Sequence, residues 1–369
     1  MKLWQIVVAV AAGVVVGTFE PGKLTYAFGH GTLYVFLPAL LFEAAWNLNY
    51  RAIVRQWAAI ATLAGPGVLI TASIVAVALT IVRVPFGPAL LTGAILSATD
   101  PIAVVAVFRR LRVPKSLSTI VECESLFNDA VAVVLYRGVL AALALGLSAS
   151  TSGAVAVVAL VTLGGAIGGI ALGIALAITV AWLLRQSRSV SRQIFSTACC
   201  AYGAYFVADY LQISGIFAVI ACGIALRYFE RRWITLDIAD EVRQFWDFIA
   251  LAANALVFFL VGAALQIGHV AQEPVFVVAC LVAIAVSRFI VAGLLLHGGY
   301  PREWIGVVRV AGMRGALSLA LAIALPASMP YREAIVDATF AVALATILAS
   351  ALTTDRVVRR VARSPRASS

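Results

Sequence analysis

The sequence predicts an all-α polytopic membrane protein with about 12 transmembrane helices. The chain has 369 residues, of which 63% are hydrophobic and 12% are charged. Soluble domains carry roughly 25% charged residues, so this chain has too few charges to cover a water-soluble globule. The high aliphatic content excludes intrinsic disorder. The apolar residues form long segments, each near the roughly 20 residues that a helix needs to cross a bilayer.

Glycine, proline and charged residues separate these apolar segments. In chain order, the predicted spans are 3–18, 32–48, 52–82, 86–109, 117–146, 153–184, 193–210, 213–231, 240–267, 274–297, 303–326 and 331–355. The net charge of +10 indicates contact with a membrane surface in so apolar a chain, and we expect no nucleic acid partner.

Basic residues gather in alternate loops between the spans. The loops or flanks that carry them are 51–55, 109–115, 185–192, 227–232 and 356–366, and Lys2 and Arg302 lie on the same side. The other side of the membrane then carries Lys23, Arg83 and Arg332. Because cytoplasmic loops are enriched in Lys and Arg, this bias predicts that both termini are cytoplasmic. We expect an integral protein of the plasma (inner) membrane.

Some charged side chains lie deep inside the predicted spans. They are Glu43, Asp100, Glu124, Asp129, Arg288 and Arg314. A charge at the centre of a bilayer costs roughly 2.5–3.5 kcal/mol or more, so each is a candidate functional residue. A structural ion pair is the alternative explanation for any one of them, but it is a poor explanation for all six together.

The predicted span 86–109 contains Thr99, Asp100 and Pro101 near its centre. Proline cannot donate a backbone hydrogen bond and crowds the carbonyl four residues earlier, so we expect a broken helix here. Free backbone carbonyls at membrane depth are tolerated where they line a cavity. A break that also carries a carboxylate and a hydroxyl is suited to binding a cation.

A second break is predicted late in the chain, in the span 303–326. There Gly312 and Gly315 flank the buried Arg314. Two glycines around an arginine indicate an irregular or closely packed segment. This segment lies late in the chain, roughly where a second structural repeat would place the counterpart of the first break.

The predicted span 117–146 supplies the central carboxylate. Residues four apart share a helix face, so Ser125 and Asp129 lie on one stripe, and Glu124 and Asn128 on the next. A carboxylate in a low-dielectric site holds a proton more readily, so proton and cation compete for Asp129. That competition would give exchange of one for the other. Glu124 faces elsewhere, and a buried arginine is its natural partner.

At these residues the sequence resembles the monovalent cation:proton antiporter family, in its sodium/proton exchanger branch. The stretches that carry the resemblance are Leu37–Ala45 (LPALLFEAA), Gly93–Pro101 (GAILSATDP), Glu124–Ala130 (ESLFNDA), Phe258–Gly262 (FFLVG) and Arg314–Ala316 (RGA). They occur in family order over almost the whole chain. SATDP followed by ESLFNDA at this separation is highly specific.

The resemblance implies a role for each candidate residue. Asp129 would bind the transported sodium ion or exchange a proton, and the other cation-site residues would be Thr99, Asp100, Ser125 and Glu43. The resemblance also implies that Glu124 pairs with Arg288 and that Arg314 steadies the crossing of the two broken helices. The pair Asn128-Asp129 resembles the electroneutral type, which exchanges one proton for one monovalent cation.

The family fold implied by the resemblance is an inverted repeat in which a core moves against a scaffold. The implied parts are scaffold helices at 1–50, core helices at 52–146, a linker helix at 153–184, scaffold helices at 193–268, core helices at 273–357 and a short basic cytoplasmic tail at 358–369. Members of this branch commonly have thirteen helices, so the chain resembles one that begins at the second. A homodimer formed through the scaffold is expected.

The resulting prediction is an electroneutral sodium(lithium)/proton antiporter with no cofactor, whose partners are the bilayer, a sodium ion and a proton. It would serve pH homeostasis. A potassium/proton exchanger is the alternative within transport, since the same carboxylates also suit potassium. A transport-inactive membrane sensor homologue is the alternative from another class. We expect no enzyme, because the sequence has no HExxH or GxSxG motif for an intramembrane hydrolase.

Overall fold

The computed structural model describes residues 3–19, 23–111, 113–147, 152–185, 189–233, 239–264, 273–295 and 299–362. These residues are almost entirely helical. The helices are α1 (Leu3–Phe19), α2 (Lys23–Asn47), α3 (Tyr50–Arg55), α4 (Trp57–Ala64), α5 (Pro66–Ile81), α6 (Phe86–Ser97), α7 (Ile102–Leu111), α8 (Lys115–Ala144), α9 (Ser152–Leu184), α10 (Val190–Tyr210), α11 (Gly215–Trp233), α12 (Ala239–Ala264), α14 (Pro274–Gly293), α15 (Arg302–Ala311), α16 (Ala316–Ile323) and α17 (Arg332–Ala362).

The observed helices follow the predicted spans in order, with two unpredicted interruptions in one span. The span predicted at 52–82 is divided into α3, α4 and α5 at Gln56 and Gly65. Pro66 begins α5 and lacks the N–H that would continue the preceding helix. The predicted breaks in 86–109 and 303–326 are confirmed, since α6 is separated from α7 and α15 from α16.

Length and composition support a membrane protein. Within the described residues, 6 helices are long and apolar enough to cross a membrane, and α1, α2 and α6 contain shorter apolar segments. The exact number of crossings stays a prediction. The expected tail at 358–369 continues α17 as far as Ala362, and residues 363–369 lie outside the described part of the chain, as do 265–267 and 296–297 of the predicted spans.

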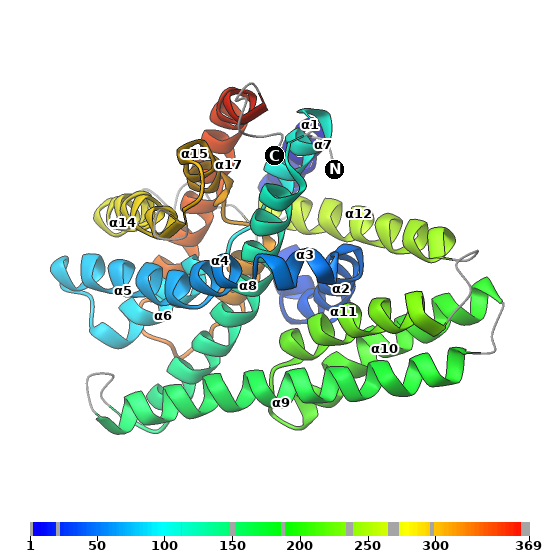
Figure 1. Cartoon of the computed structure of the whole chain (residues 1–369). Coiled ribbons are helices and arrows are strands. Elements are labelled where there is room, and N and C mark those ends of the chain that lie inside the picture. Colours follow the sequence, from blue (N-terminus) through cyan, green and yellow to red (C-terminus); the bar gives the residue numbers. More distant parts are fainter. Residues whose placement is uncertain are drawn as a thin grey trace.

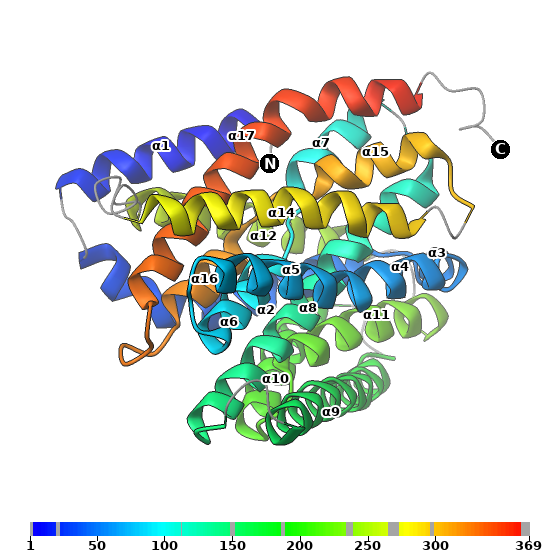
Figure 2. The ribbon, with the colours of Figure 1, turned by 90° about the vertical axis from the view of Figure 1, so that its left-hand side faces the viewer.

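Helix α8 runs through the middle of the molecule (Figure 1). Helices α9, α10 and α11 pack against one another and lie together on one side of it, and α15 and α17 lie on the opposite side (Figures 1 and 2). Helix α9 occupies the outer edge, where apolar side chains such as Leu160 and Ile167 are exposed. The breaks in α6/α7 and α15/α16 meet beside α8, so the irregular backbone lies inside the protein.

Candidate functional site

The two helix breaks are joined through their backbones. Asp100 N–H donates to the carbonyl of Met313 at 2.8 Å, which forms an isolated antiparallel bridge between the two segments. The Asp100 carboxylate accepts from the N–H of Ile102 at 2.9 Å and so caps the start of α7. Both segments leave the helical conformation here, so their backbone groups need these partners. The crossing places Asp100 between two half-helices.

Arg314 occupies the centre of this crossing and is 1% exposed. Its Nε donates to the carbonyl of Leu96 at 2.7 Å, and Nη1 donates to the carbonyl of Gly312 at 2.5 Å. Those carbonyls stand at the C-terminal ends of α6 and α15, where they lack helical partners and the helix dipole is negative. The guanidinium therefore satisfies both helix ends at once.

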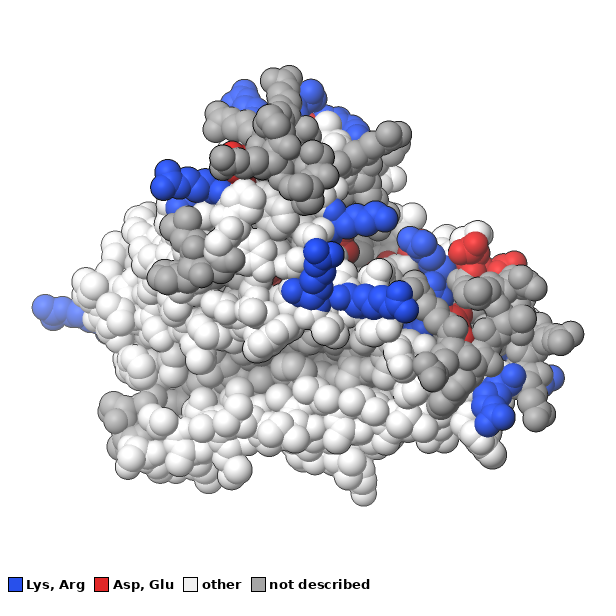
Figure 3. All heavy atoms as spheres, viewed as in Figure 1, with Lys and Arg blue, Asp and Glu red and all other residues white. Residues whose placement is uncertain are grey.

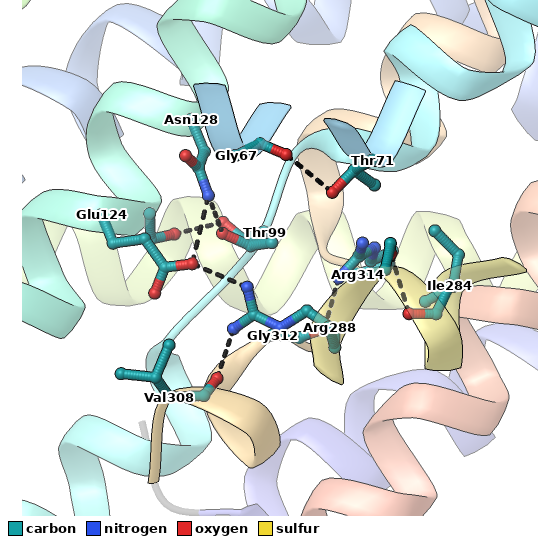
Figure 4. Close-up of polar contacts among 12 residues, drawn as sticks. Gly67, Thr71, Thr99, Glu124, Asn128, Ile284, Arg288, Val308, Gly312 and Arg314 are labelled. Carbon is teal, nitrogen blue, oxygen red and sulfur yellow. Dashed lines mark hydrogen bonds and ion pairs between the residues drawn. The ribbon is translucent and has the colours of Figure 1, made fainter. Parts of the chain in front are cut away.

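Arg288 on α14 forms a buried ion pair with Glu124 on α8. The distance from Arg288 Nη1 to Glu124 Oε1 is 2.7 Å, and the two side chains are 8% and 2% exposed. Arg288 Nη2 also donates to the carbonyl of Val308 in the last turn of α15 at 2.5 Å (Figure 4). This arginine ties α14, α8 and α15 together behind the crossing.

Asn128 extends this network to the first break. Its Nδ2 donates to Thr99 Oγ1 at 3.1 Å and to Glu124 Oε1 at 3.4 Å (Figure 4). The hydroxyl of Ser125 donates to the backbone carbonyl of Thr99. Two side chains of α8 thus fix the extended segment between α6 and α7, and the amide of Asn128 is engaged as a donor.

The predicted cation ligands surround one cavity. Its volume is about 640 Å³, and its lining includes Glu43, Thr99, Asp100, Ser125 and Asp129. They come from α2, the first helix break and α8, which are far apart in the sequence. Glu124, Asn128, Arg288, Arg314 and Gly312 do not line this cavity and lie behind it, whereas Pro101 and Gly315 are part of its wall.

Sequence reasoning missed several other polar residues of the cavity wall, among them Asn47, Glu122 and Asp247. Asn47 Nδ2 donates to Glu43 Oε1 at 2.6 Å and to Asp247 Oδ1 at 3.1 Å, which joins α2 to α12. The side chain of Asp247 is 47% exposed, so the cavity reaches the protein surface there. The spacing of Glu43 and Asn47, four residues apart on one helix, was the available signal.

Gly312 and Gly315 leave no room for a side chain. A Cβ at Gly315 would lie 2.9 Å from Cγ of Asp100, and one at Gly312 would overlap the guanidinium of Arg288. Real Cβ atoms do not approach other heavy atoms so closely, so these glycines permit the backbone of the second break to contact the two charged groups. The backbone of the second break therefore lies directly against the Asp100 carboxylate and the Arg288 guanidinium.

Charged side chains are unevenly distributed over the surface. In Figure 3, Lys and Arg side chains lie over the upper part of the molecule and along its right-hand side, whereas the surface along most of α9 is white. The exposed residues of α9 are correspondingly apolar, and they include Val155, Leu163 and Ile174. This division is the one expected of a protein with an apolar belt in lipid and a basic end in water.

Comparisons with known proteins agree with this architecture. Residues 1–360 match the family described as sodium/hydrogen exchanger, transmembrane. The solved structure of the sodium proton antiporter MjNhaP1 from Methanocaldococcus jannaschii at pH 8 superposes with a TM-score of 0.82 over 97% of this chain and 92% of its own, at 20% identity. At that identity the likeness establishes the fold, which is the antiporter fold predicted above.

Two curated relatives show similarity in sequence. Sodium/hydrogen exchanger 7 of Arabidopsis thaliana is 33% identical over 310 residues, which are 78% of this chain and 26% of the relative. The Na(+)/H(+) antiporter ApNhaP of Aphanothece halophytica is 33% identical over 303 residues, 78% of this chain and 56% of the relative. The chain thus spans about half or less of these relatives. With a family match over almost its whole length, this integral membrane protein belongs to the sodium/hydrogen exchanger family.

Proposed function

We propose that the protein is an electroneutral sodium(lithium)/proton antiporter in which Asp129 binds either a proton or the cation. The observation that carries this proposal is the cavity at the crossing of two broken helices, lined by Asp129, Asp100, Ser125, Thr99 and Glu43. Monovalent cations prefer oxygen ligands, and the cavity supplies carboxylate, hydroxyl and backbone carbonyl oxygens. The relatives named as sodium/proton antiporters support the choice of substrate.

Exchange follows from competition for one carboxylate. When Asp129 carries a proton it has no charge for the cation, and when it binds the cation the proton has left. Asn128, the neighbouring residue, donates its amide to Thr99 and Glu124 and adds no titratable carboxylate. One proton per cation is therefore the stoichiometry we propose.

Transport needs access from each side in turn. The cavity reaches the surface near Asp247, on the side of α8 that the charge bias assigns to the cytoplasm. We propose that the segments 52–146 and 273–357 move as a core against 1–50 and 193–268 to expose Asp129 on the other side. The protein would act in the plasma membrane with both termini cytoplasmic, as a homodimer.

The test is proton movement in inside-out vesicles after addition of sodium. Asp129→Asn should abolish it, because an amide cannot exchange a proton with the cation. Asp355→Asn is the matched control, since Asp355 is an acid at the exposed end of α17 and does not line the cavity. Full sodium-driven proton movement in Asp129→Asn would refute the assignment.

The second candidate is a potassium/proton exchanger, because the same oxygen ligands suit a larger cation. Titrating proton movement with lithium, sodium, potassium and rubidium separates the two. A response to potassium that equals or exceeds the response to sodium would replace the first proposal. No cation-dependent exchange at any pH would favour the transport-inactive sensor.

A further inference from the structure

We propose that the ion pair between Arg137 and Asp209 is a lock that holds the end of the transporter opposite the cavity closed, and that it opens once in each transport cycle. This inference rests on the proposed function, because it concerns movement of α8 against α10. It assigns a role to two charged residues that do not line the cavity.

The contacts of Arg137 join two groups of helices. Its Nη2 forms an ion pair with Asp209 Oδ1 at the end of α10, and its Nη1 donates to the carbonyl of Ile213 at 3.2 Å in the turn before α11. Arg137 belongs to α8, in the segment 52–146 that we propose as moving core. Both acceptors belong to 193–268, the proposed scaffold.

The position of the pair along α8 places it away from the open cavity. The residues of α8 that line the cavity are Glu122, Ser125, Leu126 and Asp129, all in its N-terminal half. Arg137 lies two turns beyond Asp129, which is roughly 12 Å along the helix axis. The pair therefore connects core and scaffold at the end of α8 away from the residues that line this cavity.

The ion pair between Arg137 and Asp209 is weak enough to break once in each transport cycle. The side chains of Arg137 and Asp209 are 37% and 26% exposed, so water reaches both. Partly exposed ion pairs change an equilibrium by roughly 1.5- to 5-fold, enough to bias the two access states without trapping either. When α8 moves along the scaffold, Arg137 separates from its two acceptors, the Asp209 carboxylate and the Ile213 carbonyl, which stay with α10 and the turn that follows it.

The first experiment measures how readily the cavity is reached in solution. Leu251→Cys is the reporter, because Leu251 lines the cavity and is 42% exposed, and the 5 native cysteines are replaced beforehand. Asp209→Asn should slow labelling of the reporter by a membrane-impermeant maleimide by up to about fivefold. The paired exchange Arg137→Asp with Asp209→Arg should restore the original labelling rate.

A matched control exists in the proposed core. Arg110 and Asp355 form an exposed ion pair between α7 and α17, both of which lie within the segments proposed to move together. Asp355→Asn should therefore leave the labelling rate of the reporter unchanged. Equal slowing in Asp355→Asn and Asp209→Asn would overturn the proposal, because loss of any ion pair would then have the same effect.

The second experiment fixes the lock. In the same background without the reporter, Arg137→Cys with Asp209→Cys is treated with a bis-methanethiosulfonate cross-linker, which joins the two thiols through a short spacer. Sodium/proton exchange should stop and should return when dithiothreitol removes the cross-link. Undiminished exchange by the fully linked protein would overturn the lock. If the cysteine-free parent protein exchanges nothing, the proposed function fails, and the labelling rate of Leu251→Cys, which does not depend on exchange, still tests the lock.

Discussion

The buried pair Arg288–Glu124 allows a quantitative prediction. Replacing Arg288 by Met removes two interactions, namely the 2.7 Å ion pair with Glu124 and the 2.5 Å bond to the Val308 carbonyl. Glu124 is then left with the Asn128 amide at 3.4 Å and 2% of its side chain exposed. Val308 loses a partner that its own helix cannot supply, because α15 ends at Ala311.

The magnitudes follow from these contacts. Removing one member of a buried ion pair costs about 3–5 kcal/mol, because the remaining charge stays in a low-dielectric site. An unsatisfied buried carbonyl adds about 1–3 kcal/mol. We therefore expect Arg288→Met to lower the free energy of unfolding by roughly 4–8 kcal/mol. Replacing Glu124 by Met as well removes the orphaned carboxylate, so the double variant should lose only about 1–3 kcal/mol.

The assay is a reversible detergent-unfolding titration of the purified protein, in which the single and double variants are compared with Arg302→Met. Arg302 begins α15 and is exposed, so its replacement should change stability little. The reasoning would be refuted by a double variant as unstable as Arg288→Met. It would also be refuted by a single variant with unchanged stability.

Three further predictions concern the cavity. Gly315→Ala should abolish exchange, because the new Cβ would displace the Asp100 carboxylate, and overpacking should lower stability by about 1–3 kcal/mol in the same titration. Ser125→Ala should raise the KM for sodium while the Arg288–Glu124 pair keeps the protein stable, as vesicle assays at graded sodium would show. Exchange at subsaturating sodium should fall in acid, because protons occupy Asp129, and a flat response from about pH 5 to about pH 9 would contradict competition.

The sequence alone determined the class of protein and singled out the charged groups inside the spans. The scarcity of charge excluded a soluble fold, and the same scarcity drew attention to the carboxylates and arginines inside the spans. Proline and glycine at Thr99-Asp100-Pro101 and around Arg314 predicted two broken helices, and both breaks occur. These features can be read from the sequence because each depends on residues that are neighbours along the chain. A helix break depends on backbone chemistry, and a charged residue in an apolar span is conspicuous because of the cost of a charge in lipid.

Only the tertiary structure decided which groups meet. The sequence predicted an arginine partner for Glu124, but which atoms meet is set by the packing of α14 on α8 and α15, across 164 residues of chain. Asn47 and Asp247 join the cavity wall because α2 packs against α12. The division of the span 52–82 at Gln56 and Gly65 also escaped prediction, although Pro66 was an available signal for the second of these breaks.

The part of the site that the sequence did not determine depends on distances between distant segments. Spacing along α8 separates Ser125 and Asp129 from Glu124 and Asn128, but it does not say which pair faces a cavity. The crossing of the two breaks determines which face of α8 lines the cavity. At this crossing Arg314 satisfies the ends of α6 and α15, and Asp100 is left beside the cavity. Residue types therefore determine what the site can bind, and helix packing determines which side chains form it.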